Sequence, residues 1–316
     1  MTRHTITPVP EQVRPAVWEA EHRPPPIGRG WLYLLVAAMV LMWTANFIVG
    51  KVAVREFSVL ALGGLRIQLA SAILLAVLVA RRGLAGLEPL RREWKLMALL
   101  ALSGVVLTQC LFVAGLKYTS VAHSSLIISL GPVFVLVLAR LHGLEELSAL
   151  KVLGLGVSLA GMAVLVGERH PGQAPSLLGD LLAATGCLAF SYYVILSKEV
   201  TPRFDSLALN TYTFLVGGLM LVPVSLAAVA AGGLSQVTWK GWLAMVYMSV
   251  CASVLAYLIF YYALRFISAT RLTALSYLQP PLATFLGFVL LKEQVTLRLL
   301  VGAAVIFTGV YLAERG

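Results

Sequence analysis

The sequence predicts an all-α membrane protein with ten transmembrane helices in two inverted five-helix repeats, and with both termini in the cytoplasm. Three observations lead to this fold class. The 316 residues are 59% apolar and 12% charged, whereas soluble domains are about 45–50% apolar and about 25% charged. Apolar runs long enough to cross the roughly 30 Å hydrocarbon core recur along the chain, and the second half repeats the first. This composition excludes an ordinary soluble protein, a disordered chain and a disulfide scaffold.

The apolar runs follow a polar, proline-rich segment at residues 1–30, which we expect to be a disordered cytoplasmic tail. The first apolar run has no small-residue cleavage signature after it, so a signal peptide is not expected. Helices are the expected spanning form, because a helix satisfies its own backbone in lipid and runs such as 73–80 lack the alternation of a barrel strand. The predicted spans are 31–50, 59–80, 95–116, 119–139, 150–167, 177–197, 207–230, 240–263, 269–291 and 296–313.

The distribution of lysine and arginine predicts the orientation. With the amino terminus inside, sixteen of these residues fall in inside segments and seven in outside segments. Cytoplasmic loops carry the positive excess in membrane proteins, so both termini are expected inside. The net charge of +10 has the same explanation. Nucleic acid is not an expected partner, because the basic residues lie at the ends of apolar runs without a basic–aromatic cluster.

An internal repeat relates the two halves, which we place at 31–167 and 177–313. An offset of 148 residues holds over the last 45 residues or so of each half and drifts to 147 in its first helix. Because each half has five spans, the second half enters the membrane from the opposite side. Inverted repeats of this kind are typical of secondary transporters, whose substrate site lies between the halves. Aligned pairs are Lys51 and Lys198, Leu116 and Leu264, Pro132 and Pro280, Glu145 and Glu293, and Gly154 and Gly302.

Three local patterns recur in this duplicated chain. A helix rich in small and polar residues carries a late proline at 119–132 and again at 268–280. A glutamate lies three residues before a serine or threonine at the start of a glycine-rich helix, at 145–148 and again at 293–296. Arg66 lies early in the second predicted span. With these patterns, residues 31–313 resemble the drug/metabolite transporter superfamily, EamA type.

The resemblance implies a bacterial inner-membrane exporter of small metabolites such as amino acids, working by alternating access. It also implies that the first, third, fourth, sixth, eighth and ninth helices form the substrate site. The expected partners are a small-molecule substrate and the lipid bilayer, and the protein is expected to be a monomer or a homodimer. Direction of transport follows from the resemblance and from no residue in particular.

Polar side chains within the spans supply the candidate binding residues, since such groups usually face the bundle interior or a cavity. Several recur four residues apart, on one helical face. The alternative for the serines and threonine is hydrogen bonding to carbonyls of their own helix or small-residue packing. The sequence does not decide between the two neighbouring tyrosines at 192 and 193. The expected substrate-binding residues are Trp43, Asn46, Gln109, Ser125, Ser129, Tyr192, Tyr193, Ser253, Tyr257, Tyr261, Thr273 and Tyr277.

Pro132 and Pro280 are expected hinges, because proline interrupts the hydrogen-bond ladder of a helix. Arg66 either extends to the interface or contacts a substrate carboxylate. For His123 a structural hydrogen bond is favoured over a proton relay. Asp180 lies only near the start of the sixth span, and no acid occupies the middle of a span. We therefore expect a neutral, polar and aromatic cavity that suits a zwitterion, with aromatic or hydrophobic amino acids favoured, and no carboxylate-based proton coupling.

Other functions remain open at this point. An intramembrane enzyme acting on a lipid or lipid-linked substrate needs an acid–base pair or metal ligands at one depth, and the spans supply one histidine. An exporter of drugs or nucleosides and a structural subunit without a cavity are further alternatives. The three cysteines share no metal-ligand spacing and are interpreted as small core residues, so neither a metal nor a cofactor is expected.

Structural roles are expected for the remaining repeated residues. Glu145 and Glu293 precede helix starts, where the helix dipole favours an acid. Glycines of the fifth and tenth spans predict close packing of these two helices away from the cavity. These glycines are Gly154, Gly156, Gly161, Gly302 and Gly309.

Overall fold

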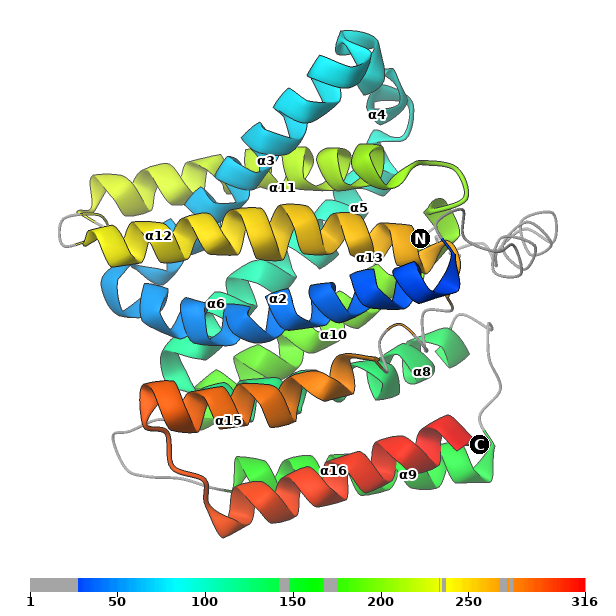
Figure 1. The fold of residues 1–316 in the computed structure, drawn as a ribbon, viewed down its shortest axis with the longest axis vertical. Helices are drawn as coiled ribbons and strands as arrows, with labels where there is room; N and C mark the ends of the chain where they lie inside the picture. The colour runs from blue at the N-terminus through cyan, green and yellow to red at the C-terminus, as the bar shows by residue number, and fades with distance from the viewer. Residues whose placement is uncertain are drawn as a thin grey trace, which may run out of the picture.

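The computed structural model describes residues 28–141, 148–167, 175–232, 234, 237–267, 272 and 275–315, and every regular element in these ranges is helical. Most of the predicted tail therefore lies outside the described residues. Figure 1 shows long helices lying side by side, with the start of the first and the end of the last on the same side of the bundle. The elements are α2 (Arg29–Glu56), α3 (Val59–Arg82), η1 (Leu84–Leu87), α4 (Glu88–Arg92), α5 (Trp94–Leu100), η2 (Ala101–Leu107), α6 (Thr108–Tyr118), α7 (Val121–Ile128), α8 (Gly131–Leu141), α9 (Ala149–Val166), α10 (Leu177–Val200), α11 (Ser206–Ala230), α12 (Trp239–Tyr247), η3 (Met248–Leu255), α13 (Ala256–Leu264), η4 (Leu275–Leu278), α15 (Gln279–Leu291) and α16 (Leu297–Arg315).

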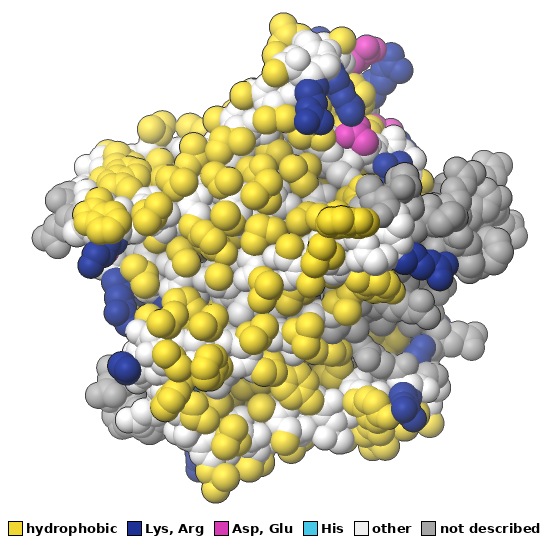
Figure 2. All heavy atoms as spheres, in the orientation of Figure 1, with side chains coloured by type: hydrophobic (Ala, Val, Ile, Leu, Met, Phe, Trp, Pro, Cys, Tyr) yellow, Lys and Arg dark blue, Asp and Glu magenta, His cyan; other side chains and the backbone are white. Residues whose placement is uncertain are grey.

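Eight helical segments in the described chain are long and apolar enough to cross a membrane, and they coincide with the first eight predicted spans. The ninth and tenth predicted spans coincide with shorter apolar helices, Gln279–Leu291 and Leu297–Ala313. Ten crossings therefore remain a prediction. Figure 2 shows hydrophobic side chains over the middle of the visible face and lysine and arginine mainly at its edges, as expected of a surface in contact with lipid.

Corresponding helices of the two halves are interrupted at corresponding places. The third helix of each half contains a π-helical segment, η2 in the first half and η3 in the second. The fourth predicted span breaks between α7 and α8, and the ninth changes from η4 to α15. Pro132 and Pro280 are each the second residue after the break. Proline is tolerated there because the first helical amides have no partner within the helix.

Packing between helices is also repeated. In the first half α2 packs on α12 and α13, and its counterpart α10 packs on η2 and α6. The counterparts α3 and α11 pack on each other, as do α9 and α16. The amino group of Lys51 donates to the Leu116 carbonyl at 2.7 Å, and the repeat-related Lys198 donates to the Leu264 carbonyl at 2.7 Å. Each lysine also bonds a carbonyl three residues farther on, Thr119 for Lys51 and Ile267 for Lys198. Each half thus ties its first helix to the end of its third through a half-buried lysine.

Glycines permit the close approach of α9 and α16. The sequence predicts this role for five glycines, and the structure confirms it for four of them. A Cβ on Gly161 would lie 2.6 Å from the Ile306 backbone nitrogen, and a Cβ on Gly309 would lie 2.3 Å from that of Ser158. Gly154 and Gly302 also face the opposite backbone. The prediction is wrong for Gly156, where a Cβ would meet no atom within 4 Å.

We predict that Gly161→Ala lowers the thermal unfolding temperature of the purified protein in detergent. The added methyl group must push two helix backbones apart, and overpacking costs about 1–3 kcal/mol. Gly156→Ala on the same helix is the matched control and should leave the unfolding temperature unchanged or slightly raised, since alanine stabilises helices. Equal destabilisation by both variants would contradict the packing described here.

Candidate functional site

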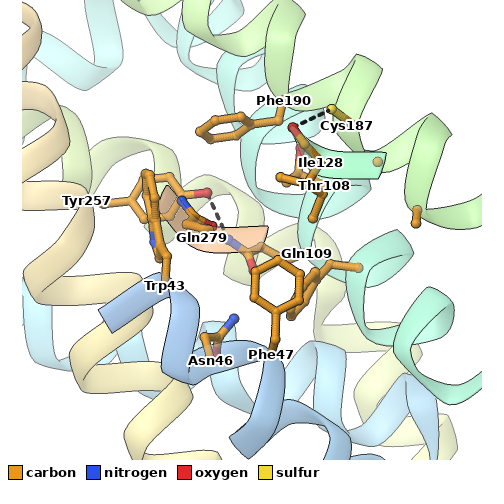
Figure 3. A pocket seen from close by; sticks show the side chains of 13 residues that line it. Trp43, Asn46, Phe47, Thr108, Gln109, Ile128, Cys187, Phe190, Tyr257 and Gln279 are labelled. Atoms are coloured by element: carbon orange, nitrogen blue, oxygen red, sulfur yellow. Dashed lines mark hydrogen bonds between the residues drawn. The ribbon is translucent and has the colours of Figure 1, made fainter. Parts of the chain in front are cut away.

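A cavity of about 100 Å³ lies between helices from the two halves of the chain. Figure 3 shows aromatic rings and amide groups converging on it from α2, α6, α10, α13 and α15. None of the described side chains that line it carries a charge, in agreement with the neutral cavity expected from the sequence. The described lining residues are Trp43, Asn46, Phe47, Thr108, Gln109, Phe112, Ile128, Ala183, Gly186, Cys187, Phe190, Tyr257 and Gln279.

Four predicted site residues come together here: Trp43, Asn46, Gln109 and Tyr257. The Gln109 amide nitrogen donates to the Tyr257 hydroxyl at 2.8 Å, a hydrogen bond between two residues 148 positions apart (Figure 3). Both are the second residue of the α-helix that follows a π-helical segment. Trp43 and Phe190, 147 positions apart, meet edge to face with ring centroids 5.8 Å apart. Residues related by the repeat therefore contact each other at the cavity.

The π-helical segment η3 supplies an anchor for Trp43. The indole nitrogen of Trp43 donates to the Ala252 carbonyl at 3.1 Å, and Ala252 lies within this segment. A π-helical segment departs from the regular i→i−4 ladder, and such segments often occur at functional sites. Trp43 also packs edge to face on Tyr257, with ring centroids 5.7 Å apart. The bond and the ring contact together fix the Trp43 side chain against the second half.

Asn46 lines the cavity with an unused acceptor. Its side chain is buried, and its Oδ1 has no hydrogen-bond partner in the described part of the chain. A buried acceptor left without a donor costs about 1–3 kcal/mol. A ligand that presents an N–H or O–H group at this point would remove that cost.

Arg66 is fully buried, so the prediction that it extends to the membrane interface is wrong. One guanidinium nitrogen donates to the Ser253 hydroxyl at 3.2 Å, while Nε and Nη1 have no hydrogen-bond partner among the described residues. Ser253 itself bonds the Met248 carbonyl within η3 at 3.0 Å. Neither Arg66 nor Ser253 lines the cavity, but both lie beside Tyr257, since Ser253 is one turn before it and Arg66 is within its electrostatic reach.

Two predicted tyrosines form a buried group beside the cavity instead of lining it. The hydroxyls of Tyr193 and Tyr261 are hydrogen-bonded to each other, and Tyr261 also contacts the Thr213 hydroxyl at 3.2 Å. The Tyr193 ring stacks on Phe260 with centroids 6.0 Å apart. Tyr192 is half-buried against the same aromatic core and likewise does not line the cavity.

The fourth and ninth spans contribute less than predicted. Ser125 donates to the Ala122 carbonyl at 2.9 Å and Ser129 to the Leu126 carbonyl at 2.6 Å, so both bond back to their own helix. Tyr277 packs edge to face on Phe307 of α16. Thr273 lies outside the described residues.

Several lining residues were not predicted. Phe190 could have been found as the repeat counterpart of Trp43. Cys187, interpreted from the sequence as a core residue, lines the cavity and donates to the Ile128 carbonyl at 3.5 Å (Figure 3). Gln279, which directly precedes Pro280, carries the same signal as Gln109, a polar side chain within a predicted span. Apolar and small wall residues such as Gly186 carry no signal in sequence, because they resemble any residue at a helix interface.

Comparison with known proteins identifies the chain's relatives. The sequence profile of the EamA-like transporter family matches residues 30–167 and again residues 177–314. An uncharacterized transporter of Archaeoglobus fulgidus is 31% identical over 284 residues, covering 89% of this chain and 96% of the relative. The uncharacterized transporter YyaM of Bacillus subtilis is 26% identical over 90% of this chain and 93% of the relative.

Two further comparisons bear on function and fold. A protein of Streptantibioticus cattleyicolor named "Probable terminal-alkyne amino-acid exporter" is 27% identical over 277 residues, covering 87% of this chain and 91% of the relative. A crystal structure of a protein 21% identical in sequence superposes with a TM-score of 0.62, covering 91% of this chain and 98% of the other. This second similarity concerns the fold alone.

We predict that Gln109 and Tyr257 are energetically coupled. Gln109→Leu and Tyr257→Phe should each destabilise the protein by about 1–3 kcal/mol, because each removes the buried hydrogen bond between these two side chains. The double variant should lose less than the sum of the two, measured by thermal or denaturant unfolding. Gln109→Leu combined with Tyr193→Phe, a tyrosine without a hydrogen bond to Gln109, should be additive. Additivity in both pairs would contradict the bond.

Proposed function

We propose that this chain, which belongs to the EamA-like transporter family, exports amino acids or similar small zwitterions, with aromatic or hydrophobic side chains favoured. That the protein is a membrane transporter with a small-molecule substrate follows from the family, which also removes the enzymatic alternative. One observation carries the choice of substrate. A cavity between the halves combines aromatic walls with a buried amide acceptor, Asn46 Oδ1, that has no donor in the described chain.

The proposed mechanism is alternating access between two inverted halves, 31–167 and 177–313. Residues related by a two-fold axis can touch only close to that axis. Gln109 with Tyr257 and Trp43 with Phe190 are two such pairs in contact, and both line the cavity. Their contact supports a substrate site on the axis, where rocking of one half against the other exposes it to each side in turn. The breaks before Pro132 and Pro280 are the proposed hinges.

The chemistry of the cavity supports recognition of an amino acid. The Asn46 oxygen is placed to accept from the substrate ammonium. The rings of Trp43, Phe190 and Tyr257 offer faces and edges to an apolar or aromatic side chain. The name of the Streptantibioticus relative also points to an amino-acid substrate, and it enters only as support for this proposal.

Arg66 is the proposed partner of the substrate carboxylate. A buried guanidinium without a carboxylate is costly, and it is stabilised by an anion placed within hydrogen-bond reach. Its nitrogens Nε and Nη1 are free of partners among the described residues. Arg66 does not line the cavity, but it interacts electrostatically with Tyr257, which does, and it bonds Ser253 one turn before Tyr257. Contact between Arg66 and the substrate therefore requires a rearrangement at the cavity wall when the solute binds.

The proposed location is the plasma membrane of a bacterium, with both termini cytoplasmic. Relatives from Bacillus subtilis and the multi-pass apolar architecture support this location. Export as the direction of transport rests on the family resemblance and on the name of one relative.

We predict that purified protein in proteoliposomes exchanges labelled for unlabelled amino acids from a panel that also includes nucleosides and cationic drugs. Tyr257→Ala should abolish exchange, because it removes a cavity wall and the hydrogen bond to Gln109. Tyr277→Ala, which lies against α16, should retain most of it. Full exchange by Tyr257→Ala would show that the site lies elsewhere. Exchange of nucleosides or drugs alone would overturn the proposed substrate class.

We predict that Asn46 and Arg66 read opposite ends of the solute. Competition assays should use phenylalanine, its N-acetyl derivative without an ammonium group, and its amide without a carboxylate. Asn46→Leu should weaken binding of phenylalanine and of the amide while changing the N-acetyl compound little. Arg66→Met should weaken phenylalanine and the N-acetyl compound while sparing the amide. Arg66→Lys is the control, because it keeps the positive charge but not the planar guanidinium group. An equal loss for all three solutes would contradict these roles.

A further inference from the structure

Each wall of the cavity combines the first helix of one half with later helices of the other half. In one wall α2 packs on α12, α13 and α15, and in the other α10 packs on α6, α7 and α8. His123 and Asp180, 1% and 0% exposed, hold α7 to α10, because the His123 Nδ1 atom lies 3.3 Å from both carboxylate oxygens. Where α7 begins, the two walls therefore meet between α7 and α15, which also pack on each other.

Glu293 bridges this boundary. It follows α15 and accepts hydrogen bonds from the Val121 amide at 2.8 Å and from the Ala122 amide at 3.3 Å, the first two residues of α7. Such amides have no partner within their own helix, and the helix dipole favours a carboxylate beside them. Lys51 of α2 bonds two carbonyls across the same boundary and lies within electrostatic reach of Glu293.

The backbone after α15 places the Glu293 carboxylate. Lys292 ends the helix in the left-handed region, with φ 59° and ψ 30°, which is uncommon for a residue that has a side chain. After this turn the Glu293 amide donates to the Gly287 carbonyl at 3.2 Å. The Glu293 side chain passes over Gly287, where a Cβ would lie 3.0 Å from Oε2. The reach of the carboxylate to α7 thus depends on a turn and on a missing side chain.

An apolar cluster connects the Glu293 contact to the cavity. Val121, whose amide bonds Glu293, belongs to one buried cluster with Phe47, Leu116 and Ala283. Phe47 also lines the cavity. Two members of the cluster, Phe47 and Ala283, come from the wall of α2 and α15, and the other two come from the wall of α6 and α7. The cluster must therefore part when α7 separates from α15.

We propose that Glu293 holds the outer gate of the cavity closed, an inference that rests on the proposed alternating access and orientation. Figure 1 shows the chain leaving α15 at the end of the bundle opposite both labelled termini, which is the outer end when the termini are cytoplasmic. While both hydrogen bonds to α7 are formed, the cavity is closed at this end. When they break, water reaches the freed amides and the carboxylate, the apolar cluster parts, and the solute leaves outward. Glu293 acts through α7 and does not touch the solute.

The first test measures this gate without a solute. In a Cys110→Ser, Cys251→Ser background Cys187 is the one remaining cysteine, and it lines the cavity. A membrane-impermeant maleimide is added to intact cells or to inverted membrane vesicles that contain the full-length protein. Glu293→Ala should raise the labelling rate from the outer side by about tenfold, on the order of one or two net hydrogen bonds, without raising it from the cytoplasmic side. Glu293→Gln, which keeps an acceptor oxygen at the same reach, should lie between Glu293→Ala and the parent.

Glu56→Ala is the matched control. Glu56 lies at the same end of the bundle (Figure 1) and accepts from the Thr238 amide at 2.9 Å, directly before α12. This contact joins α2 to α12 within one wall, so the control should leave labelling unchanged from both sides. Equal rises from both sides in Glu293→Ala would indicate general loosening of the bundle. That result, or an unchanged outer rate, would overturn the inference.

A disulfide gives a second test that does not remove Glu293. A Cβ on Gly287 would lie 3.6 Å from the Val121 Cβ, within the range that a disulfide requires. In Val121→Cys, Gly287→Cys protein, oxidation should lower outer labelling of Cys187 below the level of the parent, and reduction should reverse the change. Outer labelling that does not respond to oxidation, or absence of the disulfide from the folded protein by mass spectrometry, would overturn the inference. Failure of every amino acid to exchange would count against the proposed function alone, because neither test uses a solute.

Discussion

Hydrocarbon offers no hydrogen-bond partner, so every polar group inside this bundle must find one within the protein or in its substrate. Most of the helices obey this constraint through their own backbone and through serines that bond back to it, such as Ser125 and Ser129. Where the backbone ladder is disturbed, side chains from the other half supply donors. Trp43 bonds a carbonyl of the π-helical segment η3, and Cys187 bonds the last residue of α7. Both of these donors line the cavity, so the helix irregularities and the cavity occupy the same part of the bundle.

The groups that do not meet this constraint are informative for the same reason. Asn46 Oδ1 and two nitrogens of Arg66 are buried without partners among the described residues. Keeping these polar atoms is costly to the bundle, and the proposed solute would offer them partners. An ammonium for the amide and a carboxylate for the guanidinium would satisfy both with one zwitterion. This reasoning links the energetics of an empty bundle to the chemistry of its solute.

The helices could be predicted from sequence, since run length and hydropathy report directly on a lipid environment, and eight segments of sufficient length occur where expected. The site was predicted in part. Asn46, Gln109 and Tyr257 could be identified because a polar side chain in an apolar run is expensive. Gly186 and Ile128 could not, because apolar wall residues look like packing residues, whereas Phe190 carried a signal only through its repeat relation to Trp43. The burial of Arg66 and the contact between His123 and Asp180 depend on how distant helices meet, which no local pattern encodes.

The repeat-related residues that touch at the cavity differ between the halves. Elsewhere some equivalent residues are kept, as in the lysines that tie the first helix of each half to its third. At the cavity, glutamine faces tyrosine, tryptophan faces phenylalanine, and Asn46 corresponds to Tyr193 in the other half. Identical residues around a two-fold axis would create two equivalent binding modes related by that axis, and an amino acid has no two-fold symmetry. Unequal residues on the repeated frame allow a single orientation, in which the ammonium and the carboxylate of the proposed solute would each meet one partner. In the proposed mechanism, the frame tilts either way around a substrate that is held in one pose.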